Sequence, residues 1–342
     1  MRCHFPAFSV FLVFTAIALP LGQAAALETI QGYSGIRKID PAKLAEGDIE
    51  GARIPATGGE LSISTETLFA VPLPPAKVVN LMKDTVSATT VQASDTLDVE
   101  IHLPISKPAK VGDFELLHIS KDPAGKSLLS ASARGNGNGI HVNAVEADAL
   151  AKAGSPEEAE AAWRKLLATR ARNFQERGWV SAPAYDLGSK AFNQHQEMVR
   201  LLKTMPSILD HFKDSIGAAM TARPAPGMDL PKFYWETSKI QGDRTITLAA
   251  VFARKVSDRH WQVVEPTFYV SSKYFTALIL YDVHAFEVGG KPGSLVWRGD
   301  FVITPSIGVA KGIERMAAEN ITLLEVRKSV RSFAEECRAA AQ

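Results

Sequence analysis

The sequence predicts an α+β fold in which an antiparallel β-sheet packs against a long C-terminal helix, with a helical segment in mid-chain. Three observations support this prediction. The segment from Phe233 to Phe301 reads as successive strands separated by turn sequences. Residues 156–216 instead repeat their apolar positions every three or four residues, as helices do. The chain from Gly308 to Arg338 carries one apolar stripe, typical of a helix that lies on a sheet.

The composition indicates an ordinary globular protein. The 342 residues include 38 Lys and Arg, 37 Asp and Glu, and 46% hydrophobic residues. These values exclude a disordered chain, a collagen-like repeat and a disulfide-rich miniprotein. The balanced charge argues against nucleic-acid binding, which usually shows a basic excess or patch.

The first 26 residues have the features of a signal peptide. Arg2 is followed by an apolar run from Phe8 to Leu19, which is too short to span a bilayer comfortably. The small residues at 24–26 suit a signal peptidase, so we expect a mature chain that starts at Leu27 and is not membrane-spanning. The protein is then exported, either periplasmic or secreted. The alternative is an uncleaved membrane anchor.

The expected mature chain contains a single cysteine. Removal of residues 1–26 takes away Cys3 and leaves Cys337, so the mature chain cannot form an intramolecular disulfide. Cys337 falls on the apolar stripe of the C-terminal helix, which favours a small buried side chain over a nucleophile.

The N-terminal half is expected to begin with weak patterning. Glycines interrupt residues 27–60, which we interpret as a loosely structured lead-in. A strand is expected over residues 61–71, and Pro75 precedes a helix over residues 76–83. Alternating polarity then predicts four short strands, over residues 97–103, 114–119, 127–133 and 140–145. The last two would flank a hairpin turn at residues 135–139.

The helical segment has clear boundaries at its start. Ser155 supplies an N-cap, Pro156 a first-turn proline and Glu158 a capping-box carboxylate, and Gly178 ends this first helix. We expect a second helix over about 187–203 and a third from Pro206. Residues 218–231, rich in proline, should form a linker or long loop.

The aromatic-rich segment is the most distinctive part of the chain, because Phe233 to Phe301 holds 13 of the 27 aromatic residues. Turn sequences occur at 241–243, 257–258 and 289–293. Residues 275–283 are apolar on both faces, so we expect this strand to be covered on both sides. The outer face of the C-terminal helix has mixed charge, unlike a basic membrane-binding surface.

Catalytic signatures are largely missing from the chain. It contains no G-x-S-x-G and no H-E-x-x-H sequence, and its histidines show no close metal-ligand spacing. We therefore predict no catalytic residue, no metal and no cofactor. Residues 125–127 (Gly-Lys-Ser) look like the end of a phosphate-binding loop. Ser120, however, stands where that motif has glycine, and we expect a strand after it where the motif has a helix.

A polar group on two neighbouring strands is the best candidate for chemistry. Asp282 and His284 share one face of a strand, and Arg298 and Asp300 share one face of the next. A turn centred near residue 290 or 291 would place Asp282 or His284 opposite Arg298. This group would hold the polar head of a ligand, or it would form an ion pair at the sheet surface. The large aromatic residues nearby would line an apolar ligand site or simply fill the core.

The order of elements resembles the helix-grip fold of START-like lipid-transfer domains. The resemblance rests on the strands over 97–145, the helices over 156–216, the strands over 233–303 and the helix from Gly308. It implies a curved sheet gripping the C-terminal helix around a cavity for a hydrophobic small molecule or lipid. No functional residue carries over from that family, so the expected cavity lining comes from this chain's own aromatic and polar residues: Trp235, Phe268, Tyr274, Tyr281, Asp282, His284, Trp297 and Arg298. The chain also resembles uncharacterised secreted bacterial proteins, which adds no function.

We therefore expect an exported protein that binds a lipid-like molecule and is not an enzyme. A structural or partner-binding envelope protein is the first alternative, and an unfamiliar hydrolase or isomerase is the second. Beyond the signal peptide and the lead-in, the chain is divided into residues 61–226 and 227–342, as two domains or as parts of one sheet. The sequence leaves the oligomeric state open.

Overall fold

The computed structural model describes residues 21–55, 61–87, 101–134, 139–188, 190–308, 310 and 313–342. Its centre is one eight-stranded antiparallel sheet with the order β1-β2-β10-β9-β8-β7-β6-β3. The strands are β1 (Ile49–Arg53), β2 (Ser62–Val71), β3 (Ile101–Pro104), β6 (Lys232–Ile240), β7 (Asp243–Ser257), β8 (His260–Val270), β9 (Thr276–Val288) and β10 (Lys291–Ile303). An α+β fold with a large antiparallel sheet and a C-terminal helix is therefore confirmed.

The last five strands form a meander, as the aromatic-rich segment predicted. Gln241 and Gly242 connect β6 to β7, and both adopt positive φ angles, as two-residue hairpin turns require. Gly289 and Gly290 connect β9 to β10 in the same way. Strands from the N-terminal half extend the meander at both edges: β2 pairs with β10 at one edge, and β3 pairs with β6 at the other. Residues from both halves of the chain thus build the same sheet.

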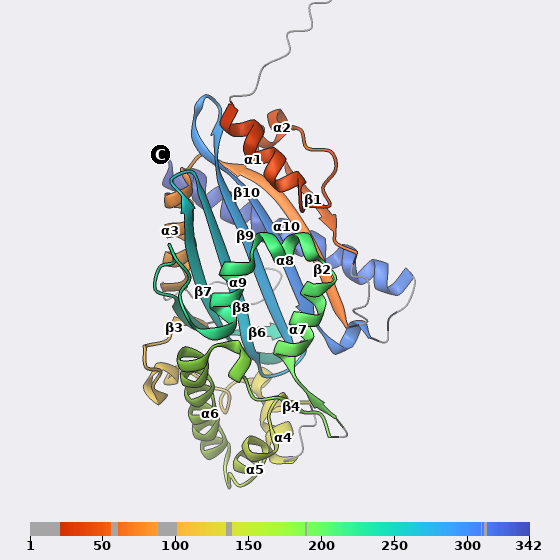
Figure 1. Ribbon diagram of the computed structural model, residues 1–342. Helices are drawn as coiled ribbons and strands as arrows, with labels where there is room; N and C mark the ends of the chain where they lie inside the picture. The colour runs from red at the N-terminus through yellow and green to blue at the C-terminus, as the bar shows by residue number, and fades with distance from the viewer. Residues whose placement is uncertain are drawn as a thin grey trace, which may run out of the picture.

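Helices cover both faces of this sheet (Figure 1). The face that presents Leu68, Leu280 and Trp297 is called the front face here, and the face that presents Phe69, Val283 and Val296 is called the back face. Front-face residues pack with α1 (Leu21–Gln31), α2 (Pro41–Glu46), α7 (Gln194–Lys203), α8 (Pro206–His211) and α9 (Lys213–Thr221). Back-face residues pack with α3 (Pro75–Ser87) and α10 (Ile313–Ala340).

The apolar residues over 275–283 are covered on both sides, as expected. Leu278 and Leu280 belong to the front-face core and Val283 to the back-face core. On α10, the expected stripe packs at Val326, Val330 and Cys337, whereas Met316 is exposed. The helix was expected to begin at Gly308, which instead ends the turn η4 (Pro305–Ile307).

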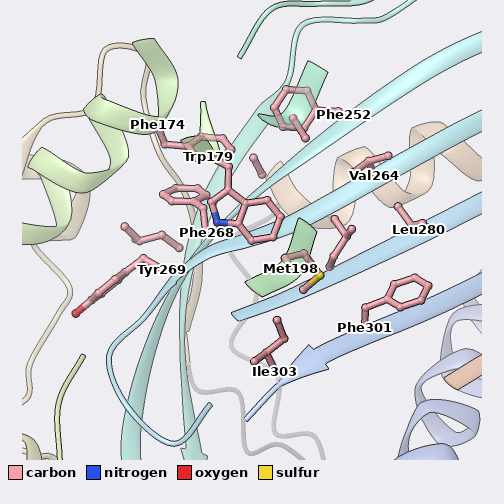
Figure 2. Close-up of a cluster of buried hydrophobic side chains, with 14 of the residues drawn as sticks. Phe174, Trp179, Met198, Phe252, Val264, Phe268, Tyr269, Leu280, Phe301 and Ile303 are labelled. Carbon is pink, nitrogen blue, oxygen red and sulfur yellow. The ribbon is translucent and has the colours of Figure 1, made fainter. Parts of the chain in front are cut away.

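A helical layer lies at one end of the sheet and consists of α4 (Lys126–Arg134), α5 (Ala144–Ala151) and α6 (Pro156–Arg177). Around it lie the turns η1 (Val111–Phe114), η2 (Pro123–Gly125) and η3 (Trp179–Ser181) and the small hairpin of β4 (Tyr185–Asp186) and β5 (Ala191–Phe192). Aromatic stacking joins this layer to the sheet, because the rings of Phe174 on α6 and Phe268 on β8 lie 3.9 Å apart (Figure 2).

The start of α6 follows its sequence signature closely. The Ser155 side chain accepts a hydrogen bond from the amide of Glu158, and Pro156 occupies the first turn. The Glu158 carboxylate reaches the amide of Gly154 instead of the N-cap amide, so it still satisfies a free donor at the helix start. Gly178 follows the helix with a positive φ of 74°, as expected.

Several expected strands are wrong. Residues 127–133 and most of 140–145 were expected to flank a hairpin, but they belong to α4 and to the loop and first turn of α5. The buried residues of α4 are Leu128, Ala131 and Ser132, a helical spacing that the sequence Ser-Leu-Leu-Ser-Ala-Ser-Ala disguises as alternation. Residues 114–119 form η1 and irregular turns. Residues 97–100 and 135–138 lie outside the described residues.

Two further expectations change in detail. The helix expected over 187–203 is divided, since its first part forms β5 and α7 begins at Gln194. The helix from Pro206 breaks at Phe212 into α8 and α9. The lead-in at 27–60 holds the last five residues of α1, together with α2 and β1. Within the described residues, no helix combines the length and apolar composition that a membrane crossing needs.

Candidate metal centre

Asp282 on β9 is the centre of a buried polar cluster on the front face. Its carboxylate is fully buried and accepts four hydrogen bonds. Oδ2 accepts from Tyr33 Oη at 2.8 Å, His211 Nε2 at 2.9 Å and His284 Nε2 at 2.7 Å, and Oδ1 accepts from His260 Nε2 at 2.6 Å. Because an ionised carboxylate only accepts, each of these imidazoles carries its proton on Nε2.

Strand pairing brings two of the histidines to Asp282. His284 follows Asp282 by two residues on β9, so both side chains share the front face. His260 begins β8 and lies directly opposite His284 in the antiparallel ladder. Their rings stack face to face, with centroids 4.1 Å apart and planes 11° apart. This pairing follows from sheet register alone.

His211 reaches the cluster from the last position of α8. Gln262, which lies opposite Asp282 on β8, donates from Nε2 to the backbone oxygen of His211 at 2.9 Å. The Oε1 atom of Gln262 in turn accepts from the buried Ser215 hydroxyl on α9 at 2.9 Å. Gln262 and Ser215 therefore fix the end of α8, and with it the position of the His211 ring.

Tyr33 closes the cluster from the segment that follows α1. Its ring stacks on His211 with centroids 4.4 Å apart and meets Trp297 edge-on at 5.0 Å. The next two residues bind the buried carboxylate of Glu66, through the Ser34 hydroxyl and the Gly35 amide, each at 2.7 Å. The N-terminal segment is thus attached to the sheet by two buried carboxylates, Asp282 on β9 and Glu66 on β2.

Burial and hydrogen bonding set the charges of the cluster. Burial alone would raise the pKa of Asp282, but hydrogen bonds from the three histidines outweigh it and hold that pKa well below its usual range. Burial and the nearby Asp282 charge raise the pKa of Tyr33 well above 10. Burial also raises the pKa of Glu66, against the hydrogen bonds from Trp297, Ser34 and Gly35. Asp282 is therefore the fixed anion of the site.

Three of these side chains are arranged as metal ligands could be. One ligand atom each from His211, His260 and Asp282 lies within 4.8 Å of the others. An imidazole binds a metal through a lone pair in the plane of its ring. The ring of His284 lies directly over that of His260, with centroids 4.1 Å apart, so their in-plane lone pairs run side by side. The rings of His211 and His260 are farther apart, with centroids at 6.0 Å and planes inclined by 24°. His260 and His211 remain partly exposed, at 16% and 19%, which gives an ion access from solvent.

The structure brings three of the sequence-predicted site residues together. Asp282 and Trp297 lie opposite each other on β9 and β10, and His284 bonds Asp282. The expected pairing of Asp282 or His284 with Arg298 is wrong, because Tyr281 lies opposite Arg298. The cause is the two-residue turn at Gly289 and Gly290, which shifts the register and places Arg298 on the back face.

On the back face, Arg298 forms its own polar group with Asp300 and Tyr281. Its Nη2 lies 2.6 Å from Asp300 Oδ1, and its guanidinium lies over the Tyr281 ring at 5.5 Å. Its Nη1 lies 3.4 Å from the Ser329 hydroxyl of α10. Asp282 and Arg298, expected to act together, are thus separated by the sheet itself.

The other three predicted residues lie far from Asp282 in the structure. Trp235 is fully buried against Phe114 and donates its indole N–H to the Asp113 backbone oxygen at 2.8 Å. Phe268 is buried in the stack on Phe174 described above. Tyr274 lies in the loop between β8 and β9. Within the described part of the chain, none of the three makes a hydrogen bond or ring contact with Asp282 or its partners.

Two surface grooves lie outside both polar groups. One, of about 460 Å³, lies between α5 and α6 and is lined mainly by apolar residues such as Leu150 and Leu166. The other, of about 170 Å³, lies between α3 and the end of α10. Neither is lined by a residue that the sequence predicted to bind a ligand.

The helix expected after a phosphate-binding loop is present, since α4 begins at Lys126. The Asp122 side chain caps the turn η2 before it by accepting a hydrogen bond from the Ala124 amide. Asp122 also pairs with Arg244 at 2.6 Å. Close packing requires glycine at position 125, because a Cβ there would lie 2.3 Å from the Ile119 backbone oxygen. These contacts explain residues 122–126 without a nucleotide.

Sequence reasoning missed Tyr33, His211, His260 and Glu66. His260 could have been found from the correct register of β8 and β9, because it alternates onto the same face as Gln262. Tyr33 comes from the turn after α1 and His211 from the end of α8, and no local pattern reveals how these segments pack on the sheet.

The chain was compared with protein-family models, with curated proteins and with solved structures, and none of the three comparisons found a match.

Proposed function

We propose that this protein binds a divalent transition metal ion through His211, His260 and Asp282. The observation that carries the proposal is the convergence of two imidazole nitrogens on one buried, ionised carboxylate, all within 4.8 Å. Histidine and carboxylate ligands suit Zn²⁺ and its neighbours in the first transition row. Three protein ligands leave a coordination position open, the arrangement that catalytic metal sites use.

The surrounding residues would support such a centre. Ligand-binding imidazoles must release the Nε2 proton that they now donate to Asp282, so an ion would replace protons in the cluster. His284 would keep its hydrogen bond to Asp282 and so orient the carboxylate. Gln262 would keep the backbone of His211 in place. These partners reduce the cost of arranging the ligands when the ion arrives.

Equilibrium dialysis against Zn²⁺, followed by elemental analysis, tests the proposal. We expect about one zinc ion per chain and at least tenfold weaker binding in His260→Ala and Asp282→Asn. His118→Ala is the matched control, because His118 is an exposed histidine on another surface. Circular dichroism checks that each variant is folded. Absence of bound zinc in the wild type, or equal loss in the His118 variant, would overturn the proposal.

Binding of a lipid-like molecule between the sheet and the C-terminal helix is a second candidate function. One observation favours it: the back face holds the Arg298–Asp300 pair beneath α10, beside two buried hydroxyls, those of Thr65 and Thr67. Among the described residues these hydroxyls have no hydrogen-bond partner. A polar ligand head would satisfy them, as the helix-grip resemblance implies. As part of this second proposal, the chain would be exported and would lose residues 1–26 as a signal peptide.

Native mass spectrometry distinguishes this second function from the first. After incubation with a total lipid extract, we expect an adduct of lipid mass that is lost in Arg298→Ala and kept in His260→Ala. A spectrum without an adduct would reject lipid binding and leave the metal proposal unaffected.

A further inference from the structure

We propose that Tyr33 supplies its phenolic oxygen as a fourth ligand at the Asp282 centre, and that the site thereby accommodates Fe³⁺. This inference rests on the proposed metal binding and names the ion class that the complete ligand set fits. The four ligands would be two imidazole nitrogens, from His211 and His260, and two oxygens, from Asp282 and from Tyr33, whose hydroxyl proton would pass to solvent as the ion takes its place.

The position of Tyr33 is the first argument. Its Oη lies 2.8 Å from Asp282 Oδ2, the same oxygen that His211 Nε2 approaches to 2.9 Å. The ring is held on three sides, by the stack on His211 and by edge contacts with Trp297 and Phe212. The oxygen is therefore placed at the centre by packing before any ion binds.

The chemistry of the phenol is the second argument. Tyr33 stacks on His211 as His284 stacks on His260, yet the two stacks differ in what they allow. The single lone pair of an imidazole nitrogen lies in the ring plane, whereas a phenolate oxygen has further lone pairs that can point out of it. Tyr33 can thus share an ion with His211, while His284 cannot share one with His260.

The choice of ion follows from the oxygen donors. Carboxylate and phenolate oxygens are hard, anionic ligands, and a trivalent cation gains more from them than a divalent one does. Zn²⁺ is satisfied by His211, His260, Asp282 and a water molecule. The Tyr33 hydroxyl should therefore matter for Fe³⁺ and not for Zn²⁺. If Tyr33 only orients Asp282, its removal should affect both ions alike.

Titration with Fe³⁺, delivered as its nitrilotriacetate complex, tests the inference on the full chain. Coordination of a phenolate to Fe³⁺ produces a charge-transfer band in the visible region, which ligation by histidine and carboxylate alone does not. We expect this band in the wild type and its loss in Tyr33→Phe, with at least tenfold weaker Fe³⁺ binding. Tyr33→Phe keeps the ring and its stack on His211, so Zn²⁺ binding should change less than twofold. Tyr281→Phe, on the back face, is the matched control and should keep the band.

The outcomes separate this inference from the function on which it rests. If the wild type binds Zn²⁺ but shows no visible band with Fe³⁺, or if the band persists in Tyr33→Phe, the inference about Tyr33 is wrong and the metal site stands. If Zn²⁺ and Fe³⁺ binding fall equally in Tyr33→Phe, Tyr33 is a positioning residue and the inference is also wrong. If the wild type binds neither ion, the proposed function itself fails.

Discussion

Trp297 on β10 donates its indole N–H to the carboxylate of Glu66 on β2, with Nε1 and Oε2 2.8 Å apart. The two side chains are fully buried, and Trp297 also lies opposite Asp282 on its other side. The same residue therefore bonds one buried carboxylate of the front face and is the cross-strand partner of another. Because Tyr33 contacts the Trp297 ring and Ser34 bonds Glu66, this connection also holds the N-terminal segment on the sheet.

Replacement of Trp297 by phenylalanine should destabilise the protein by about 2–3 kcal/mol. The change removes a hydrogen bond to a buried carboxylate and leaves part of the indole volume empty. Trp261→Phe is the matched control, because Trp261 is half-buried on the back face, and its cost should stay below about 1 kcal/mol. Urea unfolding followed by circular dichroism measures both values. Equal losses in the two variants would show that the bond to Glu66 contributes nothing measurable.

A pair of glycine substitutions should shift stability in opposite directions. A Cβ on Gly299 would lie 2.5 Å from the Trp297 ring and 3.0 Å from the Phe301 ring, so Gly299→Ala should cost about 1–3 kcal/mol. Gly217 lies exposed within α9 and has no atom near its Cβ position, so Gly217→Ala should stabilise the protein by about 0.5–1 kcal/mol through helix propensity. Thermal unfolding of both variants compares them, and a neutral Gly299→Ala would contradict the packing around Trp297.

The sheet was largely predictable because its signals are local. Aromatic and β-branched runs mark β6 to β10, and turn sequences at 241–243, 257–258 and 289–293 separate most of them, so these strands are found without any long-range information. Residues 127–133 were misassigned because their small and apolar residues fit the two-residue period of a strand as well as the 3.6-residue period of a helix. The N-cap at Asp122 and Pro123 in the turn before α4 would have favoured a helix there.

The candidate site was less predictable than the fold. Asp282 and His284 were identified, but the turn was expected too late in the chain, so Arg298 was assigned as their partner; the register instead pairs Asp282 with Trp297, one residue away, and His284 with Leu295. Such an error moves every side chain of a strand to the opposite face. His211 and Tyr33 reach Asp282 through the packing of α8 and the N-terminal segment, and no spacing along the chain reveals that packing.

His141 should make the protein sensitive to mild acid. It is buried, stacks on the Tyr185 ring and donates from Nδ1 to the Val270 backbone oxygen. Burial, aided by the charge of Arg170, lowers its pKa from 6.5 to about 4. The folded protein thus binds this proton less readily than the unfolded chain does. Its contribution to stability is complete above about pH 6.5 and is lost as the pH falls to about 4, with a total of about 3 kcal/mol.

His141→Asn isolates this contribution, because asparagine keeps an N–H donor for Val270 but cannot take up a proton. The variant should be less stable than the wild type at pH 7, where it lacks the ring stack on Tyr185. Between pH 6.5 and 4, however, it should lose about 3 kcal/mol less than the wild type does. Urea unfolding at half-unit pH steps measures the two curves, with His118→Asn as the exposed control that should follow the wild type. Parallel curves for His141→Asn and the wild type would show that His141 takes up its proton equally well in the folded and unfolded states.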